Sequence, residues 1–282
     1  MSAHIAKQVV RASAAVVAIG LLSSLAHGAA VLIDDFESYA TGQIDDEASP
    51  PWYANTSTAI VEDDGGNQIA GFGWTATRGA SRLLPAGTEL ADGVTGTYFW
   101  RIRQDDTFPN EVNNVGPTDV TSYGLSYSGA PDGDQPDRDL TNYEVLLAVT
   151  AEGKLVAGDG TSLVELMDVT LGQWINIWVE VDNASDTYDV FANTDAFTAP
   201  PDWPDPADLM AGNLLFRNST GGLQSQDLLS FVMAGDDLEN AQGTDYRNTA
   251  KADDIYFIIP EPATAVCLLM GTVLAFRRQR RG

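Results

Sequence analysis

The chain has 282 residues, and its 40 acidic residues against 15 basic ones produce a formal net charge of −25 at pH 7. A surface this negative repels phosphate backbones, which excludes nucleic-acid binding. The single cysteine, Cys267, stands near the C-terminus, and both histidines, His4 and His27, stand before residue 30. The segment 31–259 therefore has no disulfide, no thiol nucleophile, no Ser-His-Asp triad and no histidine-bound zinc site.

The N-terminal 30 residues have the pattern of an export signal. Lys7 and Arg11 form a basic start, and residues 14–25 form an apolar run of 12 residues that small residues follow. This order is typical of a secretory signal peptide rather than of a membrane span. The sequence therefore predicts a signal peptide at 1–30 and a single exported domain at 31–259, which is long enough for one sizeable core.

Alternation with a period of two residues recurs along the domain and predicts β-strands. Tyr98, Trp100 and Ile102 share one strand face, opposite Phe99, Arg101 and Arg103, for whose guanidinium groups we expect salt bridges. Residues 144–150 and 154–157 form a predicted hairpin around Glu152-Gly153. Further strands are predicted at 31–39, 58–62, 68–72, 121–127, 162–168, 187–192, 213–217, 228–233 and 253–259.

The clearest predicted strand covers residues 174–182. Its core face carries Ile175, Ile177, Val179 and Val181, and its other face carries Trp174, Asn176, Trp178, Glu180 and Asp182. Helical periodicity is nearly absent, with one turn predicted at 206–211. Short strands separated by Gly, Asn, Asp and Pro predict an all-β protein, a two-sheet antiparallel β-sandwich.

The C-terminal residues 260–282 have three parts in a fixed order. Pro260-Glu261-Pro262 is followed by an apolar run at 263–276 and then by four arginines, Arg277, Arg278, Arg280 and Arg281. The run has 14 residues, fewer than the ~20 that a membrane-spanning helix needs. A permanent tail anchor is the alternative to a signal that is cut off.

This tail resembles the PEP-CTERM sorting signal. The resemblance implies processing by an exosortase-type protease and transient association with the inner membrane through a short C-terminal helix. It also implies export through the inner membrane of a Gram-negative bacterium, to the cell surface or the extracellular matrix. It implies no particular activity.

Three segments of the domain resemble laminin-G-like, concanavalin A-type jelly rolls. They are Asp34-Asp35-Phe36-Glu37-Ser38-Tyr39 at its start, Gly172-Gln173-Trp174 with the strand that follows, and Ala252-Asp253-Asp254-Ile255-Tyr256-Phe257 at its end. The resemblance implies a two-sheet jelly roll whose first and last strands are neighbours.

Neighbouring terminal strands would bring five carboxylates together: Asp34, Asp35, Glu37, Asp253 and Asp254. Converging carboxylates repel one another, and a hard divalent cation relieves that repulsion. Jelly-roll carbohydrate-binding modules often hold a structural calcium at such a place, so the resemblance implies calcium here. The alternative is that these residues cap strands and face water. A second acidic group, Asp132, Asp134, Asp137 and Asp139, is expected to be a solvated loop.

Exposed aromatic rings are the surfaces on which sugars dock, and several tryptophans of the domain are candidates. Trp178 lies beside Glu180 on the polar face of its strand, Trp52 and Trp203 lie in predicted loops, and Trp74 is a further candidate. The sequence thus predicts a glycan-binding surface formed by Trp52, Trp74, Trp178, Glu180 and Trp203. The alternative is that most of these tryptophans fill the core, which we expect for Trp100.

Laminarinase-type glycoside hydrolases share the resembled fold and carry Glu-x-Asp-x-x-Glu on a strand. Glu180 and Asp182 match its first two positions, but Ser185 occupies the third, and nothing specifies Glu165 or Asp168 as a replacement. Glycoside hydrolysis needs two carboxylates. We therefore expect no enzyme, but an exported surface or matrix protein that binds extracellular polysaccharide. A polysaccharide-degrading enzyme on the same fold and a purely structural surface protein are the alternatives.

Overall fold

The computed structural model describes residues 29–44, 52–54, 59–72, 78–105, 120–127, 143–217, 226–235 and 250–259. The chain divides into two compact units, and every described residue except Ala29 and Ile259 belongs to the unit Ala30–Ile258. The sorting signal at 260–282 and the signal peptide up to residue 28 lie outside the described residues, so both stay predictions. None of the helices formed by the described residues is long and apolar enough to cross a membrane.

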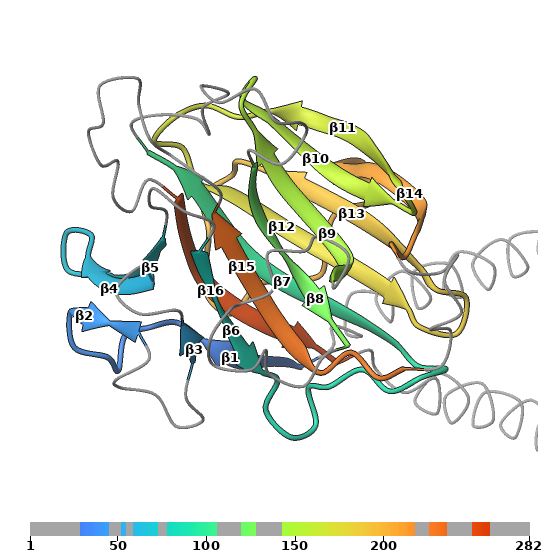
Figure 1. Ribbon diagram of the computed structural model, residues 1–282, viewed down its shortest axis with the longest axis horizontal. Coiled ribbons are helices and arrows are strands. Elements are labelled where there is room, and N and C mark those ends of the chain that lie inside the picture. Colours follow the sequence, from blue (N-terminus) through green and yellow to red (C-terminus); the bar gives the residue numbers. More distant parts are fainter. Residues whose placement is uncertain are drawn as a thin grey trace, which may run out of the picture. The chain divides into compact units, whose positions relative to one another are not determined.

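The unit Ala30–Ile258 is an all-β structure of two antiparallel sheets, as predicted (Figure 1). In sheet A the strands follow the order β14 (Leu209–Leu215), β13 (Thr187–Asn193), β12 (Ile175–Asp182), β7 (Thr95–Gln104), β16 (Ala250–Ile258), β5 (Gln68–Phe72), β4 (Ala59–Asp63) and β2 (Gly42–Gln43), and β1 (Ala30–Asp34) also pairs with β16. In sheet B the order is β11 (Ser162–Asp168), β10 (Lys154–Asp159), β9 (Tyr143–Thr150), β8 (Val120–Ser126), β15 (Ser230–Gly235), β6 (Arg78–Leu83) and β3 (Tyr53–Ala54).

Most strands lie where the alternation predicts them, and the differences have local causes. The β9–β10 hairpin turns at Gly153, whose φ of 71° suits glycine. Strand β14 begins at Leu209, earlier than the predicted 213. The helical turn predicted at 206–211 is shorter than expected and ends as the 3-10 segment Pro206–Asp208. Strands β2 and β3 have only two residues each, and β6 shows no clear alternation, so all three were missed.

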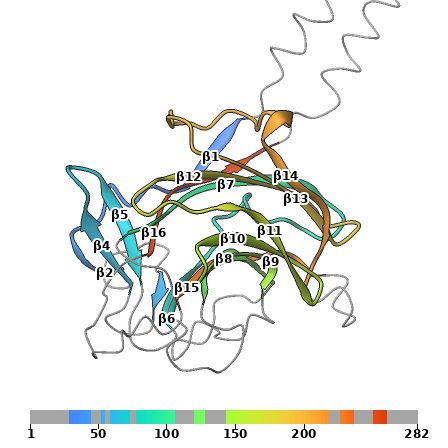
Figure 2. The same cartoon turned by 90° about the horizontal axis from the view of Figure 1, so that it is seen from above.

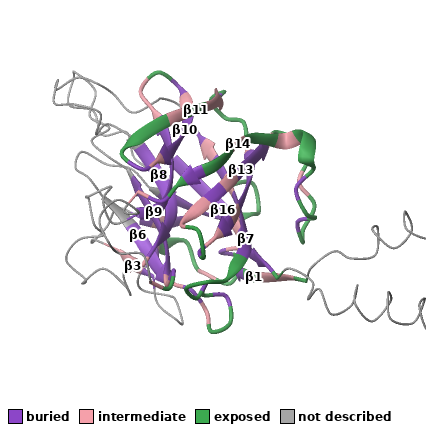
Figure 3. Cartoon of the chain, turned by 90° about the vertical axis from the view of Figure 1, so that its right-hand side faces the viewer, coloured by how far each residue is buried: buried purple, intermediate pink, exposed green. Residues whose placement is uncertain are grey.

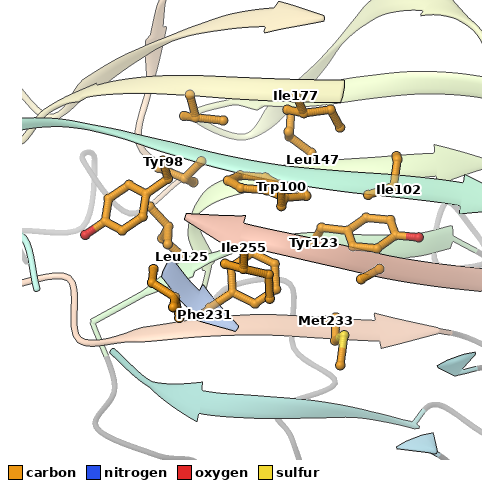
Figure 4. Packing of buried hydrophobic residues seen from close by; sticks show 14 of the residues in the cluster. Tyr98, Trp100, Ile102, Tyr123, Leu125, Leu147, Ile177, Phe231, Met233 and Ile255 are labelled. Carbon is orange, nitrogen blue, oxygen red and sulfur yellow. The ribbon is translucent and has the colours of Figure 1, made fainter. Parts of the chain in front are cut away.

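The core lies between the two sheets. Sheet A contributes Tyr98, Trp100 and Ile102 from β7 and the predicted face of β12, Ile175, Ile177, Val179 and Val181, all buried. Sheet B contributes Tyr123, Leu125, Leu147, Phe231 and Met233, and Figure 4 shows these side chains meeting those of sheet A. The alternation of period two therefore identified the core faces correctly.

The first and last strands of the domain are neighbours, as the jelly-roll resemblance implies. Strand β1 pairs with β16 in an antiparallel register that matches Val31 with Phe257 and Leu32 with Tyr256. An irregularity between Leu32 and Asp34 then places Asp34 opposite Ile255, which belongs to the core. The Asp34 side chain accordingly enters the interior, while Asp35 follows outside the strand.

Inside the core, Asp34 forms a buried ion pair with Arg82 of β6, and the pair connects the two sheets. The Asp34 carboxylate also accepts hydrogen bonds from Trp52 Nε1 (2.8 Å), from the Tyr39 hydroxyl (2.7 Å) and from the backbone N of Phe36 (2.9 Å). Burial lowers the pKa of Arg82. The hydrogen-bond donors around Asp34 offset the loss of water that both charges suffer on folding.

We predict that Arg82→Met lowers the free energy of unfolding by about 3–5 kcal/mol, because it leaves the Asp34 charge buried without its cation. Urea denaturation measures this. Lys154→Met is the matched control, because Lys154 pairs with Glu165 and Asp168 at the surface, where an ion pair contributes little. Equal losses in both variants would show that the Asp34–Arg82 pair is not a special contact.

Candidate functional site

The face of sheet A that points away from sheet B carries a row of large apolar side chains. The strand registers match Phe99 of β7 with Trp178 of β12 and with Tyr256 of β16, and Trp178 with Phe191 of β13. The Phe99 and Trp178 rings lie 4.9 Å apart between their centres. We call Tyr256, Phe99, Trp178 and Phe191 the aromatic row; with Ile258 they form a small cluster of their own outside the main core.

The segment 194–208, which joins β13 to β14, covers the aromatic row; we call it the strap. Phe197 of the strap stacks on Phe99 with ring centres 5.2 Å apart and planes 11° apart. Trp178 Nε1 donates to the carbonyl oxygen of Asp202 at 2.9 Å. Figure 2 shows the strap in orange on the outer side of sheet A, and Figure 3 shows much of it as exposed. Trp178 retains only 8% exposure, so this predicted glycan-binding residue does not face solvent.

Next to the aromatic row, two carboxylates lie directly opposite each other. Glu180 of β12 is the cross-strand partner of Asp189 of β13, and both side chains are half-buried. Side chains at such positions have Cβ atoms ~5 Å apart. Burial raises the pKa of Glu180, the Asp189 charge raises it further, and a hydrogen bond from Trp203 opposes the rise. The site thus holds one carboxyl group that retains its proton more readily than usual.

Strand β14 holds Asp189 in place. The backbone N of Asn213 donates to Asp189 Oδ1 at 2.6 Å. A β-bulge in the β13–β14 pairing lies here, and Asn213 has a φ of 56°. A Cβ atom at Gly212 would lie 3.1 Å from Asp189 Oδ1, so glycine lets β14 approach this carboxylate closely.

The partner of Glu180 therefore comes from the neighbouring strand and not from the motif along its own strand. Asp182 of that motif instead holds the β12–β13 turn, where hydrogen bonds from Ser185 and from the backbone of Ala184 lower its pKa. Glu165 and Asp168 lie on β11 of the other sheet, and each binds Lys154. Asp189 was missed because the register between β12 and β13 determines its position, although its place on the outer face follows from the alternation in 187–192.

The remaining predicted glycan-binding tryptophans separate into different environments. Trp52 is 1% exposed and donates to Asp34, so it is a core residue and the prediction for it is wrong. Trp203 is 37% exposed on the strap beside Glu180, so it can meet a ligand. Trp74 lies outside the described residues.

The five predicted calcium ligands do not form one group. Asp34 binds Arg82 in the interior, and Glu37 Oε1 accepts from the backbone N of Gln68 at 2.9 Å. Among the residues that the structure describes, no group of three or more Asp, Glu, His or Cys is arranged to hold a metal ion. Calcium therefore stays a prediction without a fitting ligand set in these residues. The acidic group at 132–139 lies outside them.

Asp253 and Asp254 of β16 form a buried acidic pair with an arginine. A β-bulge and a φ of 52° at Asp254 place both carboxylates near Arg101 of β7, whose Nη1 lies 2.8 Å from Asp254 Oδ2 and 3.8 Å from Asp253 Oδ2. Asn67 Nδ2 donates to Asp253 at 2.9 Å. Burial and the neighbouring Asp254 charge raise the pKa of Asp253 to about 7.

The expectation of salt bridges for Arg101 and Arg103 is confirmed. Arg103 binds Asp64 at 2.6 Å and Asp105 at 2.7 Å, in addition to the contacts of Arg101 with the acidic pair. Trp174 lies against both guanidinium groups, 4.5 Å from that of Arg101 and 4.7 Å from that of Arg103. These two arginines are therefore occupied by the protein's own carboxylates.

No family model and no curated protein matches the chain. Solved structures with a similar arrangement include the catalytic domain of a GH131 β-glucanase from Podospora anserina, at 12% identity and a TM-score of 0.48 over 82% of this chain and 97% of that one. Lectin II from Ulex europaeus is 11% identical, with a TM-score of 0.44 over 82% and 97% of the two chains. A sialidase is 11% identical with a TM-score of 0.45, and the chain spans only 18% of its length.

These similarities contradict one prediction from the sequence. We expected the protein not to be an enzyme, and that prediction is wrong as stated, because similar structures include a glucanase catalytic domain and a sialidase. The incomplete Glu-x-Asp-x-x-Glu motif was a poor reason to exclude catalysis, since it tested for a second carboxylate along one strand only.

The raised pKa of Asp253 predicts a pH-dependent stability. An unfolded aspartate titrates near pH ~4, so between about pH 4 and 7 the folded protein binds a proton that the unfolded chain releases. Stability should therefore fall as the pH rises through this window and level off above it. The stability advantage of Asp253→Asn over the wild type should grow between pH 5 and pH 8 by on the order of 2 kcal/mol, as measured by urea denaturation.

The exposed Asp202→Asn serves as the control for a change of net charge alone. A wild-type protein whose stability rises between pH 5 and 8, with Asp253→Asn following it in parallel, would contradict this assignment.

Proposed function

We propose that the domain is an exported jelly-roll β-sandwich that binds a polysaccharide and hydrolyses its glycosidic bonds at Glu180 and Asp189. The observation that carries this proposal is the cross-strand pairing of two half-buried carboxylates, one of which has a raised pKa. Glycoside hydrolysis requires two carboxyl groups whose environments separate their protonation states.

Each group has a role that follows from its surroundings. Glu180 retains its proton more readily than an ordinary glutamate, which suits it to donate that proton to the glycosidic oxygen as the bond to the anomeric carbon breaks. The backbone N of Asn213 donates to Asp189 and fixes this carboxylate opposite Glu180, so it can activate the attacking water or attack the anomeric carbon itself. Trp203 of the strap offers an exposed ring beside the pair, on which a short sugar can lie while the strap stays in place.

The pair is costly for the fold, which supports a functional reason for it. Like charges directly opposite each other on neighbouring strands are destabilising. On β10 and β11 the acidic residues Glu165 and Asp168 share the cation of Lys154. Within the described residues, neither Glu180 nor Asp189 has an ion pair with Lys or Arg. The repulsion between Glu180 and Asp189 is therefore not relieved by a cation, and it raises the pKa of Glu180, the proposed proton donor.

The charges of the domain favour an uncharged polysaccharide. Segment 31–259 contains 39 acidic and nine basic residues, so an anionic glycan would be repelled from most of its surface. In the part of the chain that the structure describes, several of these cations bind the protein's own carboxylates; they include Arg82, Arg101, Arg103, Lys154 and Lys251. Neutral β-glucans are accordingly the first substrates to test.

We further propose that the chain is exported and sorted to the cell surface or matrix, as its two terminal segments indicate. In a host with an exosortase-type protease, mass spectrometry of the processed protein should find a chain that starts near residue 30 and lacks the segment after Pro262. Glu261→Ala should retain that segment. A protein recovered uncut from the cytosol would contradict the proposal.

For the reaction, we predict that Glu180→Gln and Asp189→Asn each lower the release of reducing ends from β-glucans by at least ~100-fold, because each removes one of the two required carboxyl groups. Wild-type activity should fall as the pH rises through the raised pKa of Glu180, since the proton donor is then lost. Glu165→Gln, which alters a carboxylate of the other sheet, is the control and should retain activity. Full activity of Glu180→Gln would overturn the assignment.

A further inference from the structure

We infer that the strap, residues 194–208, is an intramolecular cover that occupies part of the glycan-binding face, and that binding of a longer glycan displaces it. This inference rests on the proposed function and concerns the regulation of the same site. The aromatic row under the strap adjoins the Glu180–Asp189 pair along β12 and β13, so displacement would extend the site from one carboxylate pair to a row of rings.

The strap is held by few contacts. Eleven of its fifteen residues are exposed, so most of it does not contribute to a core. Besides the buried Pro201 and Pro204, its anchors are the stacking of Phe197 on Phe99, the contact of Arg101 with the Phe197 ring, the hydrogen bonds from Trp178 to Asp202 and from Trp203 to Glu180, and two contacts at its ends. At the ends, Asn176 Nδ2 donates to the carbonyl oxygen of Asp195 at 3.0 Å, and Asn193 Nδ2 donates to Asp208 at 2.6 Å. Segments with so few buried contacts open without unfolding the rest of a protein.

The face beneath the strap is polar as well as aromatic, and the strap does not satisfy all of its polar atoms. Asn176 Oδ1 and Arg101 Nε are buried and have no hydrogen-bond partner. A buried polar atom without a partner is unfavourable and calls for an explanation. Both atoms lie beside rings of the row, since Asn176 is two residues from Trp178 on β12 and Arg101 is two residues from Phe99 on β7.

A glycan has the groups that this face lacks. The flat apolar side of a pyranose ring can take the place of Phe197 on Phe99, and its hydroxyl groups can both donate and accept hydrogen bonds. A hydroxyl could accept from Trp178 in place of the Asp202 carbonyl oxygen. Hydroxyls could also pair with Asn176 Oδ1 and Arg101 Nε, which the strap leaves unpaired. A ligand with these properties competes with the strap for the same contacts.

A cover of this kind lowers the apparent affinity for a glycan, because only the molecules in which the cover is open can bind. The apparent affinity is proportional to that open fraction. Phe197→Ala removes its main anchor and should raise the open fraction. We expect amide hydrogen exchange at 194–208 to become at least tenfold faster, while β7 and β12 keep their protection. Laminarihexaose and cellohexaose should bind about tenfold more tightly, as measured by calorimetry in the Glu180→Gln background that prevents cleavage.

Thr198→Ala, at an exposed neighbouring position of the strap, is the matched control and should exchange and bind as the wild type does. Asp208→Ala removes the anchor at the end of the strap and should act in the same direction as Phe197→Ala, which keeps the test valid if Phe197→Ala folds poorly.

Three outcomes decide the inference. Faster local exchange with tighter binding supports it. Strap amides that exchange only with global unfolding, or anchor variants that bind as the wild type does, overturn it and leave the proposed function standing. If neither oligosaccharide binds to the wild type or to any strap variant, the proposed function fails, and the inference fails with it.

Discussion

The structure depends on a carboxylate in its core. Asp34 sits at the end of β1 in sheet A, and its ion pair reaches Arg82 of β6 in sheet B. The domain has no cysteine, so no disulfide joins its two layers. A buried ion pair is a poor source of stability unless its remaining hydrogen-bonding capacity is used. Trp52, Tyr39 and the backbone of Phe36 use that of Asp34, which ties residue 52, the turn at 36–39 and, through Arg82, β6 to one position of β1.

That one contact has consequences on the opposite face of the sheet. Because Asp34 must point inward, Asp35 follows outside the core, where its charge raises the pKa of Asp254 further, although burial is the largest cause of that rise. The bulge in β16 places Asp253 and Asp254 together beside Arg101, where strict alternation would have put them on opposite faces. Five carboxylates that the sequence groups at one place are thus divided between the core, a turn and an arginine-bound pair. The irregularity in the β1–β16 pairing thus turns Asp34 away from the other expected calcium ligands.

The sequence predicts those features of this structure that depend on neighbouring residues in one strand, and it misses those that depend on contacts between distant strands. Alternation within a strand is local, so it correctly gave the core faces of β7 and β12 and the β9–β10 hairpin. It could not give the register between strands, which pairs Glu180 with Asp189 and decides the candidate site. It failed at β6, because Arg82 faces inward where the pattern expects an apolar residue. Alternation correctly placed Trp178 on the outer face of β12. It could not show that Trp178 is buried, because the strap that covers this face comes from another part of the chain.

The aromatic row shows that sheet A has two apolar surfaces where a two-layer sandwich needs one. An antiparallel sheet with water on one side normally alternates apolar and polar residues, and outward positions of a central strand are polar. In the row, Phe99, Trp178 and Phe191 occupy such outward positions side by side. The strap alone is an incomplete reason for them, because Phe197 is its ring that stacks on the row and Asn176 Oδ1 and Arg101 Nε are left unpaired. Holding one ring of a strap does not require a row of rings side by side, whereas a sugar docks on aromatic faces of this kind.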